Sequence, residues 1–321
     1  MFEIFGIPST ALFGQLLLGL INGSFYALLS LGLAVIFGML NIINFAHGAQ
    51  YMMGAFAAFL LLQGGATLEP LCGWLPSSIA HGCTLLTSYV PPIPYWGALI
   101  IAPIIVGAIG IVIERSLLQW LYKLDHLYGL LLTFGLALVI EGVFRHQYGS
   151  AGLPYALPEQ LTGGRNLGFM FLPNYRGWVI LVSLVVCFGT WFVIERTKLG
   201  SYLRAATENP TLVRAFGINV PRMITLTYGF GVGLAALAGV LAAPIYNVSP
   251  QMGSDLIIVV FAVVVIGGMG SIMGAIVTGF GLGIVEGLTK VFWPEASNTV
   301  IFVIMAIVLL IRPAGLFGRR A

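Results

Sequence analysis

Long runs of apolar residues, separated by short polar stretches, follow one another along the whole chain. A helix needs about twenty apolar residues to cross the hydrocarbon layer of a membrane. The Leu256–Gly268 run is short for a full crossing, and Leu40–Gly48 fits either a re-entrant turn or a loop. The pattern predicts about eight or nine spans, near Ala11–Leu40, His47–Gln63, Gly97–Ile113, Leu127–Phe144, Gly177–Ile194, Met223–Asn247, Leu256–Gly268, Ser271–Thr289 and Thr299–Ile311.

The composition supports a chain surrounded by lipid. Only 8% of the 321 residues are charged, 59% are hydrophobic, and the mean hydropathy is +1.01, whereas soluble globular proteins carry about 25% charged residues. In lipid, unpaired backbone groups are so costly that only helices and closed barrels span the membrane. Barrel strands are short and alternate apolar with polar residues, but these runs are continuous. The sequence therefore predicts an all-α, polytopic transmembrane helix bundle, one domain over residues 1–321.

Basic residues are concentrated on one predicted side of the membrane, which sets the orientation. Cytoplasmic connections are enriched in Lys and Arg, so we expect the amino terminus outside and the carboxyl terminus in the cytoplasm. The amino terminus lacks a positively charged leader region, so the first run is expected to remain a span. The opposite side holds four basic residues: Arg145, Arg165, Arg176 and Lys290. The predicted cytoplasmic side holds ten of the fourteen: Arg115, Lys123, Arg196, Lys198, Arg204, Arg214, Arg222, Arg312, Arg319 and Arg320.

The predicted external loop, residues 64–96, contains Cys72 and Cys83. A disulfide is permitted outside the cytoplasm, and two unpaired thiols are the alternative. Cys187 lies within a span and is expected to be a small packing residue. The three cysteines have no metal-binding spacing, and the net charge of +3 is too small and scattered to indicate a nucleic-acid partner. No metal or cofactor is expected.

Glycines mark two further features of the predicted spans. Gly279, Gly283 and Gly287 are spaced by four residues, which places them on one helix face and lets a neighbouring helix approach closely. The turn Gly267–Ser271 separates two apolar runs, and a polar interruption at Asn41–Gly48 lies near the other end of the chain. Interrupted helices in two halves of a transporter suggest an internal structural repeat.

Residues 195–222 are expected to form a cytoplasmic hairpin. The pattern predicts a short helix ending near Thr207, a break at Asn209–Pro210, and a second short helix that Gly217 terminates. A stiff amphipathic hairpin of this kind can act as a lever against a soluble partner, and an ordinary basic loop is the alternative. The hairpin has a small apolar face that comprises Leu212, Ala215 and Phe216, and two arginines, Arg204 and Arg214, flank this face.

This segment resembles the cytoplasmic coupling loop of the branched-chain amino acid class of ABC importer permeases. The likeness extends over nearly the whole chain, through Asn22–Ala27, Asn44–Gly48, Gly267–Ser271 and the tail Arg312–Gly318. The long external loop, residues 64–96, departs from the family pattern. The resemblance implies an ATPase-coupling role for Arg204, Ala205, Glu208, Asn209, Arg214, Ala215, Gly217 and Ile218.

The resemblance also implies a function and a set of partners. Such a permease translocates branched-chain or other amino acids, or similar small carboxylates and amides, inward across the bacterial inner membrane. It works with a second permease subunit (a related chain or another copy), two cytoplasmic ATPase subunits and an external substrate-binding protein. The chain lacks G-x-x-x-x-G-K-[ST], the motif that cradles ATP phosphates. We therefore expect a transport subunit and not an enzyme, with ATP hydrolysis on partner chains.

Polar side chains inside the first two spans are the candidates for the translocation pathway, because polar residues at membrane depth commonly mark a route for solutes. If the second helix starts near Asn44, its free N–H groups would attract a carboxylate. Alternatively, Asn44 caps a helix and His47 binds a neighbouring carbonyl. The candidates are Asn22, Ser24, Tyr26, Asn41, Asn44, His47 and Gln50.

Two acid–base pairs are spaced by four residues: Glu141 with Arg145, and Glu286 with Lys290. Pairs at this spacing lie on one helix face and neutralise each other. An ion-coupled secondary transporter that acts alone is the alternative function, and it would need an acidic residue in mid-membrane. Because both acids have basic partners and lie toward span ends, the sequence favours the ATPase-driven permease. Asp255 is expected to stabilise the amino end of the following helix.

Overall fold

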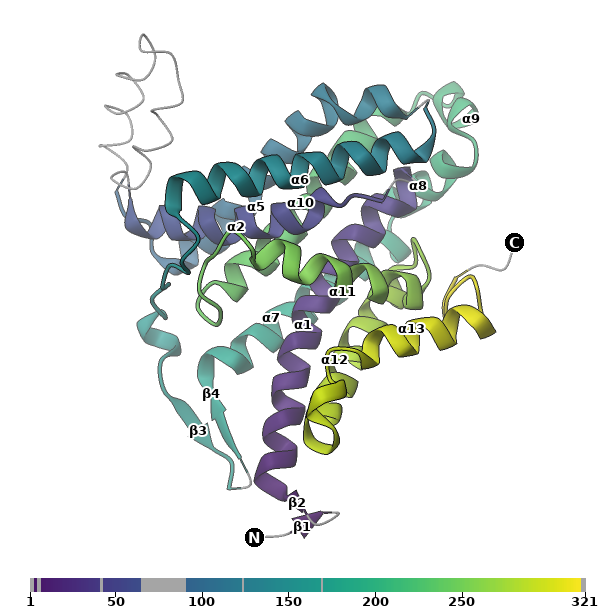
Figure 1. Cartoon of the computed structure of the whole chain (residues 1–321). Helices are drawn as coiled ribbons and strands as arrows, with labels where there is room; N and C mark the ends of the chain where they lie inside the picture. Colours follow the sequence, from purple (N-terminus) through teal and green to yellow (C-terminus); the bar gives the residue numbers. More distant parts are fainter. Residues whose placement is uncertain are drawn as a thin grey trace. The chain divides into compact units, whose positions relative to one another are not determined.

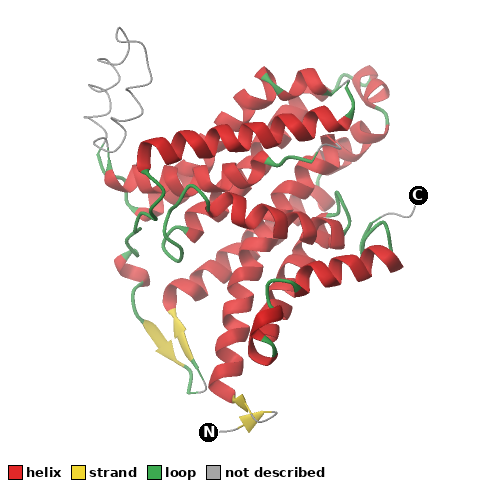
Figure 2. Cartoon of the chain, viewed as in Figure 1, coloured by secondary structure: helices red, strands yellow, loops and turns green. Residues whose placement is uncertain are grey.

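Helices make up most of the computed structural model, which describes residues 3–4, 7–40, 43–64, 91–122, 124–168 and 170–318 (Figures 1 and 2). The helices are α1 (Ser9–Leu40), α2 (Ala46–Gln63), α5 (Tyr95–Ser116), α6 (His126–Tyr148), α7 (Asn174–Arg196), α8 (Lys198–Glu208), α9 (Pro210–Ala215), α10 (Val220–Ala242), α11 (Met252–Gly267), α12 (Ile272–Phe292) and α13 (Val300–Ile311). Short 3₁₀ helices are η2 (Leu118–Leu121), η3 (Glu159–Leu161) and η4 (Pro294–Ala296). Two antiparallel strand pairs join β1 (Glu3–Ile4) to β2 (Ile7–Pro8), and β3 (Gly164–Asn166) to β4 (Phe171–Pro173).

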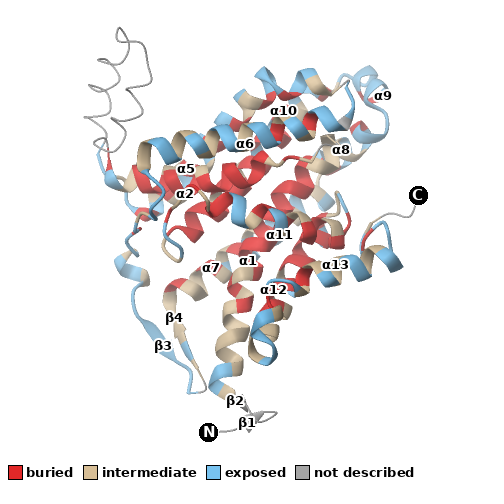
Figure 3. Ribbon diagram, in the orientation of Figure 1, coloured by how far each residue is buried: buried red, intermediate tan, exposed pale blue. Residues whose placement is uncertain are grey.

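The predicted helical membrane protein is confirmed. Within the described ranges, six helices are long and apolar enough to cross a membrane, namely α1, α5, α6, α7, α10 and α12, and α11 and α13 are shorter apolar helices. Large apolar side chains such as Ile104, Leu131 and Phe188 remain exposed on α5, α6 and α7. Exposed apolar side chains are what lipid-facing helices require, whereas buried residues dominate the middle of α1 (Figure 3).

Several predicted span boundaries were wrong by a few residues, including the two described next. The run predicted to continue to Asn247 ends as a helix at Ala242, because Pro244 has no backbone N–H and cannot extend the helix. Helix α11 begins at Met252, before the predicted start at Leu256, which places Asp255 in its first turn. A carboxylate there interacts favourably with the helix dipole, as predicted.

Part of the predicted external loop lies outside the described residues. The structure does not describe residues 65–90 of this loop, so the state of Cys72 and Cys83 stays a prediction. Residues 41 and 42 also lie outside the described ranges, and five residues separate the end of α1 at Leu40 from the start of α2 at Ala46.

Contacts between residues divide the chain into two compact units, each assembled from separate segments. The first unit comprises Met1–Ile43, Glu159–Thr227 and Ile257–Ala321. The second comprises Asn44–Pro158 and Tyr228–Leu256.

In the first unit, α1 packs on α12 through glycines. A Cβ atom at Gly283 would lie 2.4 Å from the Gly19 carbonyl oxygen and 2.4 Å from the Gly23 Cα. A Cβ at Gly279 would lie 2.6 Å from the Ala27 Cα, and one at Gly287 would lie 2.5 Å from a backbone oxygen of α1. Since the two backbones are in direct contact, only glycine fits at these positions. The predicted close-packing face of α12 is confirmed.

The turn between α11 and α12 is fixed by the carboxyl-terminal tail. Gly268 and Gly270 have φ angles of +100° and +81°, which L-residues with side chains rarely adopt. The Leu316 N–H donates to the Ile266 carbonyl (2.8 Å), and the Phe317 N–H donates to the Gly267 carbonyl (3.1 Å). These bonds satisfy carbonyl groups that the end of α11 would otherwise leave free. Two motifs that lie far apart in the sequence thus form one structure.

Candidate functional site

The first group of predicted pathway residues converges on a buried carboxylate, Glu286 of α12. The Asn22 Nδ2 atom donates to Glu286 Oε1 (3.1 Å), and the Tyr26 hydroxyl donates to Glu286 Oε2 (2.7 Å). The Lys290 ammonium group forms an ion pair with the same carboxylate. Ser24 does not join the group, because its hydroxyl donates to the Leu20 carbonyl of its own helix.

This group connects α1 to α12 electrostatically. A carboxylate that is only 5% exposed is costly unless it is paired and hydrogen-bonded, and Glu286 receives three donors. The predicted Glu286–Lys290 pair is confirmed, as is the Glu141–Arg145 pair. The contribution of Asn22 and Tyr26 to this pair was missed, although their spacing of four on one helix face was a usable signal.

A second group of polar side chains lies in the second unit, where Tyr228 joins Asn44 and Gln50. The Asn44 Nδ2 atom donates to the Tyr228 hydroxyl oxygen (3.1 Å) and to Gln50 Oε1 (3.3 Å). The Gln50 Nε2 atom also donates to the Tyr228 hydroxyl oxygen (3.0 Å). All three side chains are buried. Hydrogen-bonded polar groups in a buried setting hold one another in a fixed arrangement.

The start of α2 uses its N–H groups within the protein. The Ala46 N–H donates to Asn44 Oδ1 (3.1 Å), and the His47 N–H donates to the Asn44 carbonyl (3.2 Å). The Phe45 N–H donates to the Thr133 hydroxyl (3.2 Å). Asn44 thus binds the first N–H of α2, but Phe45 occupies the N-cap position and makes no side-chain cap bond, so the predicted capping by Asn44 was wrong in detail. His47 is fully buried, and Asn41 lies outside the described residues.

A further buried acid of the second unit was not identified from the sequence. Glu114, at the end of α5, is 2% exposed and accepts a hydrogen bond from the Tyr122 hydroxyl at 2.6 Å. Burial first, and then this hydrogen bond and the charge of Glu114, raise the pKa of Tyr122 well above its ordinary value. An acidic residue at the end of an apolar run was the available signal.

The predicted hairpin is confirmed as two short helices, α8 and α9. Asn209 terminates α8, and its side-chain oxygen accepts from the Leu212 N–H (2.9 Å), while Pro210 occupies the first turn of α9. Gly217 follows α9 with a φ angle of +81°. The conformation of the hairpin therefore follows from its own sequence.

The hairpin buries one apolar face and exposes another. Val213 is buried with Ala206 and Val220 in a small apolar cluster. Leu212 and Phe216 are 55% and 77% exposed. The hairpin thus carries two large, exposed apolar side chains close together in the sequence. The predicted coupling residues Ala205, Glu208, Asn209, Arg214, Ala215 and Gly217 are also exposed, and Ile218 is partly buried.

Comparison with known proteins decides what kind of membrane protein carries these features. The family model described as "Branched-chain amino acid transport system / permease component" matches residues 15–309. The chain belongs to the branched-chain amino acid transport permease family.

Curated relatives align over nearly the whole length of this permease. It is 30% identical to the high-affinity branched-chain amino acid transport system permease protein LivH of Escherichia coli K12 and 32% identical to BraD of Pseudomonas aeruginosa, each over 95% of both chains. It is 27% identical to the probable permease protein LivM of Methanocaldococcus jannaschii, over 92% of this chain and 91% of the relative. Because its family and these relatives are permease components, the chain is a transport subunit and not an enzyme. No solved structure matches the chain.

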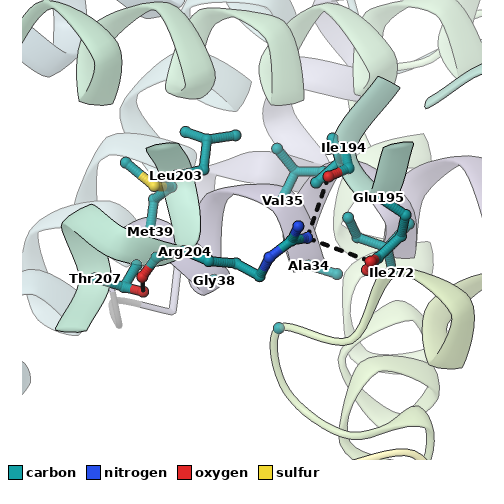
Figure 4. Close-up of a pocket in the computed structure, with 11 residues that line it drawn as sticks. Ala34, Val35, Gly38, Met39, Ile194, Glu195, Leu203, Arg204, Thr207 and Ile272 are labelled. Atoms are coloured by element: carbon teal, nitrogen blue, oxygen red, sulfur yellow. Dashed lines mark hydrogen bonds and ion pairs between the residues drawn. The ribbon is translucent and has the colours of Figure 1, made fainter. Parts of the chain in front are cut away.

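In this permease, Arg204 points back toward α7 and not out from the hairpin (Figure 4). Its Nη1 atom donates to the Ile194 carbonyl oxygen and to Glu195 Oε2, both at 3.2 Å. The guanidinium group lies beside a cavity of about 100 Å³. The cavity is lined by the ends of α1 and α7, by α8, and by the turn before α12: Ala34, Val35, Gly38, Met39, Ile194, Glu195, Leu203, Arg204, Thr207, Gly270 and Ile272.

Proposed function

We propose that this chain is the membrane-spanning permease subunit of a binding-protein-dependent ABC importer for branched-chain or other amino acids. The observation that carries the proposal is the exposed Leu212–Phe216 surface, held on a well-defined hairpin in a chain of this permease family. ATPase subunits on separate chains would bind this surface and drive transport. Solute would move inward through alternation between outward- and inward-open conformations.

The relatives support a proposed set of partners. In Methanocaldococcus jannaschii, one protein named as a LivH permease and another named as a LivM permease both match this chain, at 26% and 27% identity. Two related permeases in one organism support a heterodimer with a second permease subunit, with a pair of identical chains as the alternative. An external substrate-binding protein would deliver the solute on the side opposite the hairpin.

The pathway is proposed to include the polar residues of α1 and of the start of α2. The amide and phenol groups of Asn44, Gln50 and Tyr228 are a buried set that can exchange their mutual hydrogen bonds for bonds to a carboxylate. Buried polar groups rarely remain without partners, so such an exchange would need a solute with matching groups. We further propose that the hairpin lies in the cytoplasm of a bacterial cell and that the amino terminus lies outside the inner membrane.

Copurification tests the proposal. A tagged chain should retain ATPase subunits from its native host in mild detergent, and replacement of Phe216 by Ser should release them. The matched control is Trp120→Ser, which removes an aromatic side chain of similar exposure, 73%, from a different connection. Retention of ATPases by Phe216→Ser, or equal loss with Trp120→Ser, would contradict the proposed docking surface. Amino acid uptake by the purified chain alone under an ion gradient would favour the secondary transporter.

A further inference from the structure

The junction between α7 and α8 is organised around a single carbonyl group, that of Ile194. The last carbonyls of a helix have no partners within that helix. The Ile194 carbonyl oxygen instead accepts a hydrogen bond from Arg204 of α8 at 3.2 Å. The Thr197 hydroxyl donates to the adjacent Val193 carbonyl. The end of α7 is thus capped by side chains of the connection and of α8.

Gly200 brings α8 onto the same carbonyl. A Cβ atom at Gly200 would lie 1.5 Å from the Ile194 oxygen and 2.5 Å from its carbonyl carbon. Any side chain at this position would therefore force the two helices apart. Gly200 and Arg204 are one helical turn apart, so they lie on one face of α8. Gly200 permits the close approach of the two helices, and the hydrogen bond from Arg204 stabilises it.

The ion pair between Arg204 and Glu195 contributes less to this junction than the hydrogen bond to the Ile194 carbonyl. The side chains of Arg204 and Glu195 are 41% and 45% exposed, and exposed pairs contribute little to stability. The hydrogen bond to the Ile194 carbonyl is partly buried and uses a charged donor, which makes it stronger than a neutral bond. Its directionality fixes the orientation of α8 at the end of α7.

A cavity lies where α8 faces the end of α1 and the turn before α12. The cavity of about 100 Å³ separates Leu203 and Thr207 of α8 from Gly38 of α1 and from Gly270 of the turn before α12. A cavity of this size leaves its walls without full van der Waals contact. The direct contacts of α8 at its junction with α7 therefore offer a route by which movement of the hairpin can reach α7.

We propose that Arg204 is a positioning residue that, together with Gly200, locks α8 to α7 and transmits the movement of the hairpin to that span. This inference rests on the proposed coupling function of the hairpin. Arg204 would act inside the permease and would not bind the ATPase. The Arg204–Gly200 junction therefore has a measurable signature: its loss uncouples hydrolysis from transport without releasing the partner.

The test measures amino acid uptake and ATP hydrolysis in parallel, on the assembled transporter purified through a tag on this chain and reconstituted into proteoliposomes. Loss of a coupling contact changes coupling about two- to thirtyfold in other systems. We expect Arg204→Ala to lower the uptake per ATP hydrolysed by at least about fivefold, with the ATPase subunits still bound. Arg204→Lys, which keeps a charged donor, should restore most of the ratio. Arg115→Ala, which removes an exposed arginine outside the hairpin, is the control.

A distance measurement distinguishes the outcomes. Spin labels at Phe192 of α7 and Tyr202 of α8, both exposed, should report one narrow distance that ATP does not change, and Arg204→Ala should broaden it. An unchanged coupling ratio and an unchanged distance distribution in Arg204→Ala would overturn the inference. If Arg204→Ala releases the ATPases, Arg204 is a docking residue and the inference is wrong. If Phe216→Ser leaves the ATPases bound, the proposed function of the hairpin fails instead.

Discussion

The contact between α1 and α12 predicts that two glycines on α12, only two residues apart, respond oppositely to the same substitution. A Cβ atom at Gly283 would lie 2.4 Å from three backbone atoms of α1, the Gly19 oxygen and the Gly23 nitrogen and Cα. Real Cβ atoms do not approach backbone atoms so closely, so the helices must separate. Overpacking of this kind costs about 1–3 kcal/mol. Gly283→Ala is therefore expected to lower the free energy of unfolding by about that amount.

Gly281 supplies a matched control within the same helix. A Cβ atom at Gly281 would meet no described atom within 4 Å. Gly281→Ala therefore adds only the helix propensity of alanine, which stabilises an exposed helix position by up to about 1 kcal/mol. Both substitutions add one methyl group, so differences in composition or hydrophobicity cancel between them.

Thermal unfolding of the purified protein in one detergent, followed by circular dichroism, measures both effects. The midpoint should fall for Gly283→Ala and remain or rise for Gly281→Ala. Equal midpoints for the two variants would show that the close contact of α1 with α12 does not exist as described.

Three further predictions address other parts of the chain. Tyr26→Phe should cost about 1–3 kcal/mol, and a double-mutant cycle with Glu286→Gln should show coupling in thermal unfolding; additive effects would contradict their direct bond. Asn209→Ala removes the cap of α9 and should cost about 1 kcal/mol of local stability, visible as faster amide exchange in α9 alone; unchanged exchange would refute the cap. The raised pKa of Tyr122 means that its contribution to stability is complete below the unfolded value of 10.0 and decreases as pH rises above it. Tyr122→Phe should therefore lose less stability above pH 10.0 than the parent protein. If the stability of the two proteins falls equally with pH above 10.0, the raised pKa of Tyr122 is not the cause.

Much of the fold was predictable because lipid imposes simple rules on a sequence. Apolar length located the long apolar helices to within a few residues, and glycine spacing identified the packing face that carries Gly283. Local chemistry was equally informative in the hairpin, where Asn209, Pro210 and Gly217 specify a helix break and a helix end without help from distant residues. These features depend on residues that are neighbours along the chain or along one helix.

Features that depend on distant residues were less predictable. Nothing in the local sequence places Tyr228 beside Asn44, or Tyr26 beside Glu286, because these contacts arise from the packing of one helix on another. The same holds for the tail, whose Leu316 N–H completes the end of α11. Arg204 illustrates the limit most clearly. The resemblance implied an ATPase-coupling role for it, and its contact with the end of the preceding span could not be seen in the sequence.

Uptake of a labelled branched-chain amino acid shows whether ATPases bound to the hairpin drive transport through this permease. The complex retained by a tagged chain is reconstituted into proteoliposomes with its binding protein, and uptake is measured with and without ATP on the side of the hairpin. We predict uptake that requires ATP and that Phe216→Ser abolishes. Uptake that is equal without ATP, or that the chain performs alone under an ion gradient, would contradict it.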